Sequence, residues 1–465
     1  TSPRNRQQPA CQRKTPYPVT RGREFLKSEK TVPAMFTSNH SDRARLVLLA
    51  GSLLVLAACS SSNNGSNSSQ NNPPPANPPA APVTVMAFAG DDDSGDVQNT
   101  SSWALDPDAT SYTVYWSNVP GVTGNSNVVV PTFSGTRYVV HSGVDVVAGN
   151  TYYYRVQASS ADGASALSDE VAGTPQQSPT NNSLNDVAWN GVDTLVAVGD
   201  SGVILTSPNA TTDAWVDVSL VAVPQQLAGV TWDNVNSQFL IVGAGNTVVT
   251  GDGANWVQED LSNLPGANNL QDAAWLGDKY IVVGNNGTIL TSNVDGSLWV
   301  AQDPGPNLGT TSFNAVAAND TRIVVVGTNG TILTSTDNVA WEVQPLAENN
   351  DLNDITWDGS QFTVVGSNDT VLTSADGLAW TSHIPGTSDI NFVAVTQFDS
   401  GLVQYPVLCT VGSSGTVVVD PAADPGAIVH TGTNRQLGGV TLVDDGVSRA
   451  YLVIVGNDGT VATAQ

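Results

Sequence analysis

The sequence predicts an all-β protein, because a hairpin-like phrase recurs along the chain. Val324–Trp341 reads V-V-V-G-T-N-G-T-I-L-T-S-T-D-N-V-A-W, and related copies occupy 282–299 and 364–380. In each copy a β-branched run closes on Gly, a polar turn follows, and a second β-branched run ends in Thr-Ser, which is typical of a β-hairpin. Charged residues are only 12% of the chain, whereas turn-forming Gly, Asn and Ser are abundant.

The copies recur with a regular period. First strands of the repeats are expected to begin at 184, 227, 270, 313, 352, 390 and 437, so the period is close to 40 residues. A unit of that length with four short strands is a β-propeller blade, whereas a helical solenoid would need 3.6-residue patterning. We therefore expect a seven-bladed propeller over residues 184–465.

The last repeat is shorter than the others. It stops at Val461–Gln465, where its third strand should end. The segment before the first repeat, Thr174–Ser183, contains two prolines and no alternation of apolar and polar residues, so it is a poor strand. The sequence therefore predicts a three-stranded last blade, with the ring closed by side-chain packing between blades seven and one.

The beginning of the chain has the features of an export signal. Residues 1–34 lack periodicity, and an upstream translation artefact is one interpretation of them. Residues 35–58 contain basic residues followed by an apolar stretch of 13 residues, Leu46–Ala58. That stretch is too short for a membrane-spanning helix, which needs about 20 residues, but it suits a signal peptide. Residues 59–82 are rich in Ser, Asn and Pro and should form a disordered tether.

The end of the apolar stretch, Leu56-Ala57-Ala58-Cys59, resembles the lipobox of bacterial lipoproteins. This resemblance implies that Cys59 is lipidated and becomes the first residue of the mature protein. Ser60 at the next position resembles the pattern for passage to the outer membrane. An ordinary signal peptide with a chance cysteine is the alternative interpretation.

Residues 83–175 differ from the tether, because they contain alternating apolar and polar residues. Residues 176–183 are expected to form a linker to the repeats. Y-T-V-Y-W at 112–116 and Y-Y-Y-R-V-Q-A-S at 152–159 alternate between turn signals. The segment resembles a fibronectin type III domain, with Trp103 at the position of the core Trp and Tyr152 at that of the tyrosine corner. The resemblance implies a β-sandwich that acts as a spacer or as a binding module.

Two repeats carry a further motif. S-x-D…W at 335–341 and S-x-D-G…W at 374–380 resemble Asp-box turns of the BNR, sialidase-type repeat. The phrase G-x-x-G-T-I-L-T-S is also similar to repeats of photosystem II assembly-factor-like propellers. In these families the Asp box is structural and lies between the third and fourth strands. The residues that the resemblance assigns to this role are Ser335, Asp337, Trp341, Ser374, Asp376 and Trp380.

Polar residues at the entrance of the first strands form the candidate ligand site. A propeller's first strand lines the central channel, so these side chains should ring one mouth. Amides and carboxylates suit hydroxyl-rich ligands and hard cations, but Asn and Asp also cap turns, and both interpretations stay open. The residues are Asn185, Asp186, Gln271, Asp272, Asn314, Asn353, Asp354 and Asn391. The run D-D-D-S-G-D at 91–96 offers a possible Ca²⁺ turn, without EF-hand spacing.

The search for catalytic residues favours a protein that is not an enzyme. A sialidase-like glycosidase uses an arginine cluster, and the repeats hold only Arg322, Arg435 and Arg449, which repeat register divides between two faces. No His or Cys spacing resembles a zinc site. We expect no metal and no cofactor, with Ca²⁺ as the one exception left open.

The negative net charge limits the classes of partner that this protein can bind. Ten of the sixteen Lys and Arg residues precede Ala58, which leaves six basic against thirty-nine acidic residues after it. Such a surface repels nucleic acid and anionic lipid. We therefore expect a monomeric, lipid-anchored protein of the outer membrane or cell surface that binds or scaffolds a protein or glycan. An Asp-box-type, sialidase-like glycoside hydrolase and an assembly factor for a membrane complex are the alternatives.

Overall fold

The computed structural model describes residues 78–83, 85–92, 94, 96–129, 137–207, 215–264, 266–346, 349–383, 391–398, 407–419, 427–443 and 451–464. The expected signal peptide, Cys59 and most of the tether lie outside the described residues. Within the described part, no helix is long and apolar enough to cross a membrane. The described chain is built from β-strands with short 3-10 turns, which confirms the all-β prediction.

Strands β1–β8 form what we call the N-terminal two-sheet region. β1, β2 and β5 lie side by side in one sheet, and β4, β3, β6 and β7 in the other, with β8 also on β6. Ala87 and Val139 from the first sheet share a core with Val114, Tyr154 and Val156 from the second. The strands are β1 (Met86–Asp91), β2 (Val97–Ser102), β3 (Ser111–Ser117), β4 (Asn127–Val129), β5 (Tyr138–Ser142), β6 (Tyr152–Ser160), β7 (Gly163–Leu167) and β8 (Val171–Gly173).

The rest of the described chain forms antiparallel blades. Blades one to three are β9 (Leu184–Trp189), β10 (Leu195–Gly199), β11 (Ile204–Ser207) and β12 (Val216–Asp217); β13 (Leu227–Asp233), β14 (Gln238–Gly243), β15 (Thr247–Gly251) and β16 (Trp256–Gln258); β17 (Leu270–Trp275), β18 (Tyr280–Gly284), β19 (Thr288–Ser292) and β20 (Trp299–Ala301). Blades four and five are β21 (Phe313–Ala318), β22 (Ile323–Gly327), β23 (Thr331–Ser335) and β24 (Glu342–Gln344); β25 (Leu352–Trp357), β26 (Phe362–Gly366), β27 (Val371–Ser374) and β28 (Thr381–His383).

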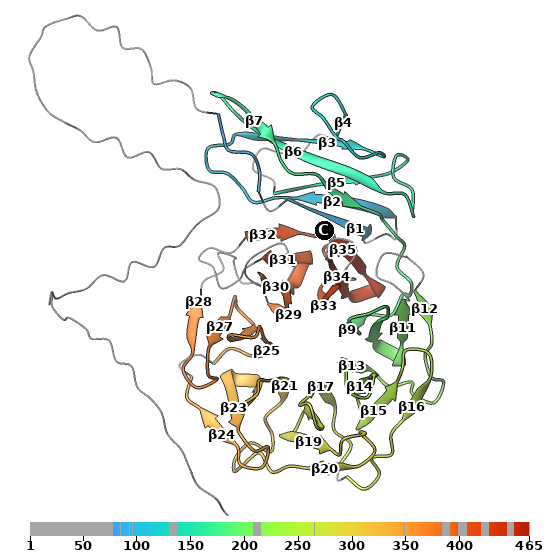
Figure 1. Cartoon of the computed structure of the whole chain (residues 1–465), viewed down its shortest axis with the longest axis vertical. Helices are drawn as coiled ribbons and strands as arrows, with labels where there is room; N and C mark the ends of the chain where they lie inside the picture. The colour runs from blue at the N-terminus through green and yellow to red at the C-terminus, as the bar shows by residue number, and fades with distance from the viewer. Residues whose placement is uncertain are drawn as a thin grey trace, which may run out of the picture. The chain divides into compact units, whose positions relative to one another are not determined.

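Blades six and seven complete the ring. Their strands are β29 (Phe392–Phe398), β30 (Val407–Gly412), β31 (Thr416–Val419) and β32 (Ala427–His430); β33 (Leu437–Val443), β34 (Tyr451–Gly456) and β35 (Val461–Ala464). The 3-10 turns between second and third strands are η1 (Asp200–Gly202), η2 (Thr328–Gly330), η3 (Ser413–Gly415) and η4 (Asn457–Gly459). First strands of consecutive blades contact one another from β9 through to β33, and β33 contacts β9 again. This closed cycle of seven inner strands is a β-propeller (Figure 1).

Burial explains the blade architecture. The second strand of blade four, I-V-V-V-G, is buried throughout, because it lies between neighbours within its sheet and between adjacent blades. The outer strand β24, E-V-Q, is mostly exposed. Strands in the middle of a blade are therefore continuously apolar, because protein covers both of their faces. The outer strands are short and polar, because they face the solvent.

The prediction of a three-stranded last blade is wrong. β35 pairs with β1, with Phe88 opposite Ala464 and Ala89 opposite Thr463, so a strand from the N-terminal two-sheet region completes blade seven (Figure 1). Phe88 is buried in a core with Cys409 and Ile454 of blades six and seven. The physical reason is that β1 and β35 would otherwise each present an unpaired strand edge, and joining them satisfies both. One sheet thus runs from β33 through β1 to β5.

The predicted start of blade six also needs correction. Phe392 pairs with Gly412 in the way that Leu352 pairs with Gly366, so this repeat begins two residues later than expected. The apolar Ile390 suggested the earlier start. Asn391 consequently precedes β29 instead of standing within it, and Val393 takes the position that Asn353 has in blade five.

Candidate functional site

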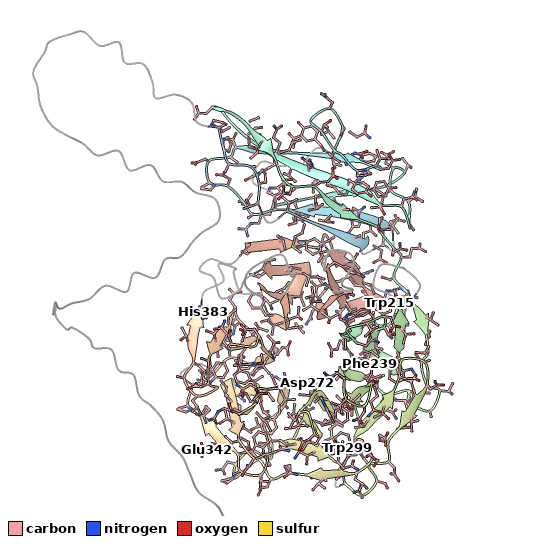
Figure 2. The ribbon with its side chains drawn as sticks, in the orientation of Figure 1. Trp215, Phe239, Asp272, Trp299, Glu342 and His383 are labelled. Atoms are coloured by element: carbon pink, nitrogen blue, oxygen red, sulfur yellow. The ribbon has the colours of Figure 1, made fainter. Side chains whose placement is uncertain are left out.

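One polar cavity gathers the candidate ligand residues. Its volume is about 550 Å³, and all eight side chains that the sequence placed at one mouth line it, namely Asn185, Asp186, Gln271, Asp272, Asn314, Asn353, Asp354 and Asn391. Figure 2 shows Asp272 toward the centre of the ring, whereas Trp299, Glu342 and His383 lie at its outer rim. These eight residues thus bring polar groups from five blades, namely one, three, four, five and six, to one place.

Three aspartates of this cavity also link neighbouring blades. Asp272 in blade three accepts the N–H of Ala273 at 2.7 Å through Oδ1 and the N–H of Val316 in blade four at 2.9 Å through Oδ2. Asp186 makes the same pair of bonds to Val187 and Val230, and Asp354 to Ile355 and Val395. The aspartates therefore connect blades one to two, three to four and five to six.

The residues at the equivalent positions of the other blades are small. Blades two, four, six and seven carry Gly229, Ala315, Ala394 and Gly439 there. A Cβ on Gly229 would lie 2.8 Å from the carbonyl oxygen of Gln271, and one on Gly439 would lie 2.8 Å from the Cα of Asp186. A side chain at Gly229 or Gly439 would therefore force the neighbouring inner strand to shift.

The amide side chains form a second set of links around the cavity. The Nδ2 groups of Asn185, Asn314 and Asn353 donate to the carbonyl oxygens of Leu227, Leu352 and Phe392 in the next blade, at 2.7, 2.8 and 2.6 Å. The Nε2 of Gln271 donates to Asn285 at 3.1 Å. Since these amides are held by the fold, they present their remaining polar atoms to the cavity in fixed positions.

The surroundings raise the pKa of all three aspartates. Burial is the main cause in each case, and it raises the pKa of Asp186 to about 7 and that of Asp272 to about 6. The pKa of Asp354 is also raised well above its ordinary value, by burial and then by the charge of Asp272. The backbone N–H groups act in the opposite direction, because they stabilise the carboxylate. The charge of Asp272 therefore also raises the pKa of Asp186 and of Asp354.

The turn at residues 91–96, where the sequence left Ca²⁺ open as an alternative to a solvated turn, is held by its own hydrogen bonds. Asp92 Oδ1 accepts the N–H groups of Ser94 and Asp96 at 2.8 and 2.9 Å and the Ser94 hydroxyl at 2.7 Å. Asp93 lies outside the described residues. In the described part of the chain, no three His, Cys, Asp or Glu side chains are grouped so that they could hold a metal ion.

The Asp-box residues lie at the other end of the strands. Asp337 Oδ1 accepts the N–H groups of Val339 and Ala340 at 2.9 Å, and the Ser335 hydroxyl accepts the N–H of Asn338 at 2.8 Å. Ser374 and Asp376 make the corresponding bonds to Gly377, Leu378 and Ala379. Trp341 and Trp380 pack against the blade cores. These contacts are what a turn-fixing role requires.

The residues considered for glycosidase chemistry do not meet in the described structure. Arg322 lies on the Asp-box side, in a pocket with Ser335 and Asp337. Arg435 precedes β33 and forms an ion pair with Asp91. Arg449 lies outside the described residues. Sialidases use a Tyr nucleophile, whereas the Tyr280 hydroxyl of this chain donates to the buried Asp233 at 2.7 Å.

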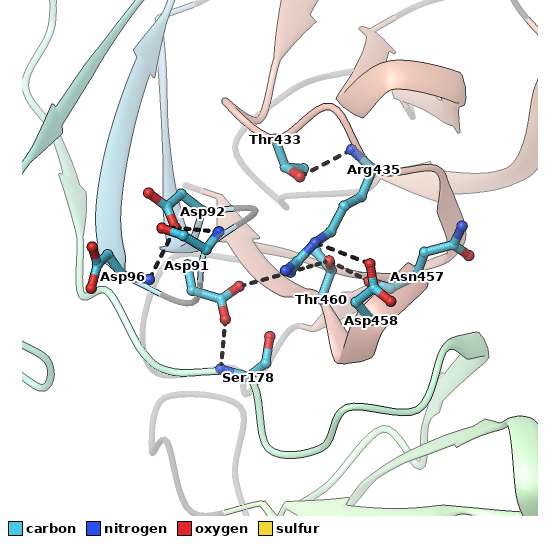
Figure 3. Close-up of polar contacts among 10 residues, drawn as sticks. Asp91, Asp92, Asp96, Ser178, Thr433, Arg435, Asn457, Asp458 and Thr460 are labelled. Carbon is cyan, nitrogen blue, oxygen red and sulfur yellow. Dashed lines mark hydrogen bonds and ion pairs between the residues drawn. The ribbon is translucent and has the colours of Figure 1, made fainter.

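The sequence did not predict a polar junction between the N-terminal two-sheet region and blade seven. Arg435 Nη1 lies 3.3 Å from Asp91 Oδ1 and donates to Thr460 at 3.2 Å, while Asp91 Oδ2 accepts the N–H of Ser178 at 3.2 Å (Figure 3). Asp91 and Arg435 side chains are only 4% and 11% exposed. The one available signal was that Arg435 is a rare basic residue in an acidic sequence.

Comparisons with known proteins give structural similarity without sequence similarity. No family profile matches the chain, and no curated protein matches it in sequence. A structure of YCF48 bound to D1 peptide is 14% identical, covers 61% of this chain and 92% of its own length, and has a TM-score of 0.49. YCF48 from Cyanidioschyzon merolae is 14% identical, covers 61% of this chain and 96% of its own length, and has a TM-score of 0.49. The WD40 propeller domain of Doa1 is 11% identical, covers 62% of this chain and 93% of its own length, and also has a TM-score of 0.49. The propeller assignment comes from the sheets themselves.

Proposed function

We propose that this protein is a non-catalytic binding module whose central cavity takes a cationic group of a partner protein, such as a lysine side chain or an amino terminus. The observation that carries the proposal is the convergence of Asp186, Asp272 and Asp354 with the five amide side chains of the candidate set in one cavity. Carboxylates and amide oxygens accept hydrogen bonds from an ammonium group, which has three donors and no acceptor.

Electrostatics supports a cationic ligand. No Lys, Arg or His is among the described residues that line the cavity, so the aspartates have no positive charge beside them there, and a bound cation would supply it. Cation binding would therefore favour the ionised carboxylates, so affinity should rise with pH between 5 and 8. The acidic surface would also attract a basic partner over a longer range.

The proposal places the module at the cell envelope. Lipidation of Cys59 would anchor the chain to the outer membrane or the cell surface, and the tether would hold the propeller away from the lipid. We also propose that the N-terminal two-sheet region is a fibronectin type III domain. In support, the Tyr152 hydroxyl accepts the N–H of Val147 at 2.9 Å, as a tyrosine corner does, and Trp103 is fully buried.

A direct test uses the full-length protein and labelled hexalysine, with hexaglutamate as the negative probe. Measurements in about 0.3 M salt suppress long-range attraction by the acidic surface. We expect hexalysine to bind more tightly at pH 8 than at pH 5, and Asp272→Ala to weaken binding at least tenfold. Alanine is a matched choice because Ala315 occupies the same position in blade four.

The control is Asp162→Ala, which removes an exposed carboxylate of the N-terminal two-sheet region. It changes the net charge equally and should leave affinity unchanged. Equal weakening by both variants would show that hexalysine binds the general acidic surface, and the cavity proposal would then be rejected. Labelled fatty acid on wild-type protein but not on Cys59→Ser tests the anchor separately.

A further inference from the structure

Blade four breaks a pattern that its neighbours keep. In blades two, three and five, a Trp at or next to the end of the first strand faces an aromatic residue across the ladder, with ring centroids 4.6 to 4.7 Å apart. The ladder of blade four has Ala318 opposite Ile323 at the same place. The neighbouring pairs are Trp232 with Phe239, Trp275 with Tyr280, and Trp357 with Phe362.

The missing aromatic pair leaves a pocket on the Asp-box side. Its volume is about 690 Å³, and Ala318 and Ile323 line it together with Trp275 from blade three and Trp357 from blade five. Both Trp side chains are only partly buried. Two indole rings thus border a space that an indole fills elsewhere in the ring. Ligand pockets typically measure about 300–1,000 Å³ and combine apolar faces with a few polar groups.

Polar side chains complete the lining. Arg322, which is partly buried, contributes a planar guanidinium whose Nη1 donates to Thr334 at 3.4 Å. Asn338 is 7% exposed, and its Oδ1 has no hydrogen-bond partner among the described residues. Lys279 also lines the pocket, so two of the six basic residues that follow Ala58 lie here.

We propose that this pocket binds a neutral saccharide, with one sugar ring against the face of Trp275 or Trp357. A pyranose presents an apolar face to an aromatic ring and a rim of hydroxyl groups to planar polar side chains. Arg322 donates to neighbouring hydroxyl oxygens, and Asp320 and the Asn338 amide accept from hydroxyl groups. This site is separate from the central cavity, which lies at the opposite ends of the strands.

The charges favour a neutral ligand over an acidic one. Asp278, Asp320 and Asp337 line the same pocket, and Asp278 lies 3.5 Å from Lys279. The acidic groups therefore offset Lys279 and Arg322, and no net positive charge remains to select a carboxylate. A peptide would need an unpaired strand edge or a row of apolar subsites, whereas the apolar lining here consists of two indoles and the small patch around Ala318.

The test measures binding of five trisaccharides to the full-length protein, namely cellotriose, xylotriose, maltotriose, laminaritriose and chitotriose. Saturation-transfer NMR detects binding and isothermal titration gives the affinity. We expect at least one to bind with a Kd of about 1 mM or tighter. Ala318→Trp with Ile323→Phe restores the aromatic pair of the neighbouring blades, fills the pocket and should weaken binding at least tenfold.

Arg322→Gln provides a second variant that leaves the core volume unchanged, and we expect a weakening of threefold or more. Arg155→Gln is its matched control, because it removes the same charge far from the pocket and should bind normally. Asp272→Ala should also bind the sugar normally, which separates this site from the central cavity. Melting temperatures verify that each variant is folded.

Three results would overturn the proposal. The first is that none of the five sugars binds the folded wild type. The second is that binding survives in the variant with the restored aromatic pair, or falls equally in Arg322→Gln and Arg155→Gln. The third is that unstructured heptapeptides bind in place of sugars and lose affinity in the filled variant, which would identify a peptide site.

Discussion

The propeller joins its blades in two different ways. Between blades one and two, three and four, and five and six, a single carboxylate accepts backbone N–H groups from both blades. Blade seven is instead completed by β1, which arrives from the N-terminal two-sheet region and is held by strand pairing and by the Asp91–Arg435 ion pair. The first kind of link is local and repeated, and the second is used once.

The difference shows what each link has to accomplish. Neighbouring blades are already brought together by the short connections of the chain, so a few side-chain hydrogen bonds suffice to set their spacing. The closing strand is separated from β35 by more than 300 residues, and closing so long a loop loses more entropy. A ladder, a buried Phe and a buried ion pair together offset that loss. The N-terminal two-sheet region therefore contributes β1 to the propeller and keeps a core of its own.

The largest expected effect tests whether β1 belongs to the propeller core. Phe88→Ala should destabilise the protein by about 3–5 kcal/mol, because it removes a fully buried aromatic side chain from the core of blades six and seven. Phe362→Ala, inside blade five, is the matched control and should have a similar effect. Urea denaturation measures both, and wild-type unfolding should be a single transition.

Two separate transitions, with only the first moved by Phe88→Ala, would contradict this expectation. They would mean that the N-terminal two-sheet region unfolds alone and leaves a stable propeller with a free β35 edge.

The second prediction concerns the buried ion pair. Arg435→Met should cost about 3 kcal/mol, because it leaves the Asp91 carboxylate buried without its cation. Adding Asp91→Leu should recover most of the loss, because no buried charge is then left without a partner. Thermal unfolding of the two single variants and the double variant measures this. If the double variant loses as much as the sum of the single ones, the pair does not act as a unit.

The sequence was sufficient to predict the propeller and the cavity lining. Both depend on a repeat, and the register of a repeat determines which residues reach the same end of the ring. The closing strand could not be predicted, because M-A-F-A-G-D shows that β1 is a strand but not which edges it pairs with. Likewise Ala318 is visibly different from its Trp counterparts, but the pocket depends on residues of three blades.

The third prediction weakens one local link. Asp272→Ala should cost about 2 kcal/mol, because the N–H groups of Ala273 and Val316 lose a charged acceptor. The loss should be smaller than for Phe88→Ala, since blades three and four remain connected by the chain. Hydrogen exchange should be faster at Val316 and unchanged at Val461 in blade seven. Equally faster exchange at both amides would show that the link is not local.

The smallest expected effect is the pH dependence of these links. A carboxyl group whose pKa is raised by folding binds more protons in the folded state than in the unfolded state between the two pKa values. Its contribution to stability is therefore fully present below the unfolded pKa of about 4 and is lost as pH rises through the folded pKa, which is about 7 for Asp186. The free energy of unfolding should thus decrease between pH 4.5 and pH 7.5.

Asp186→Ala separates the contribution of Asp186 from a second effect of low pH. Protonation of the many surface carboxylates also raises stability at low pH, because it reduces their mutual repulsion. The difference in unfolding free energy between pH 4.5 and pH 7.5 should shrink by about 1 kcal/mol or more, since one pKa unit corresponds to about 1.4 kcal/mol. Asp162→Ala, at an exposed carboxylate, should leave the difference as it is in the wild type. If Asp186→Ala kept the pH profile of the wild type, the folded protein would not raise the pKa of Asp186. Water in the central cavity would then solvate this carboxylate.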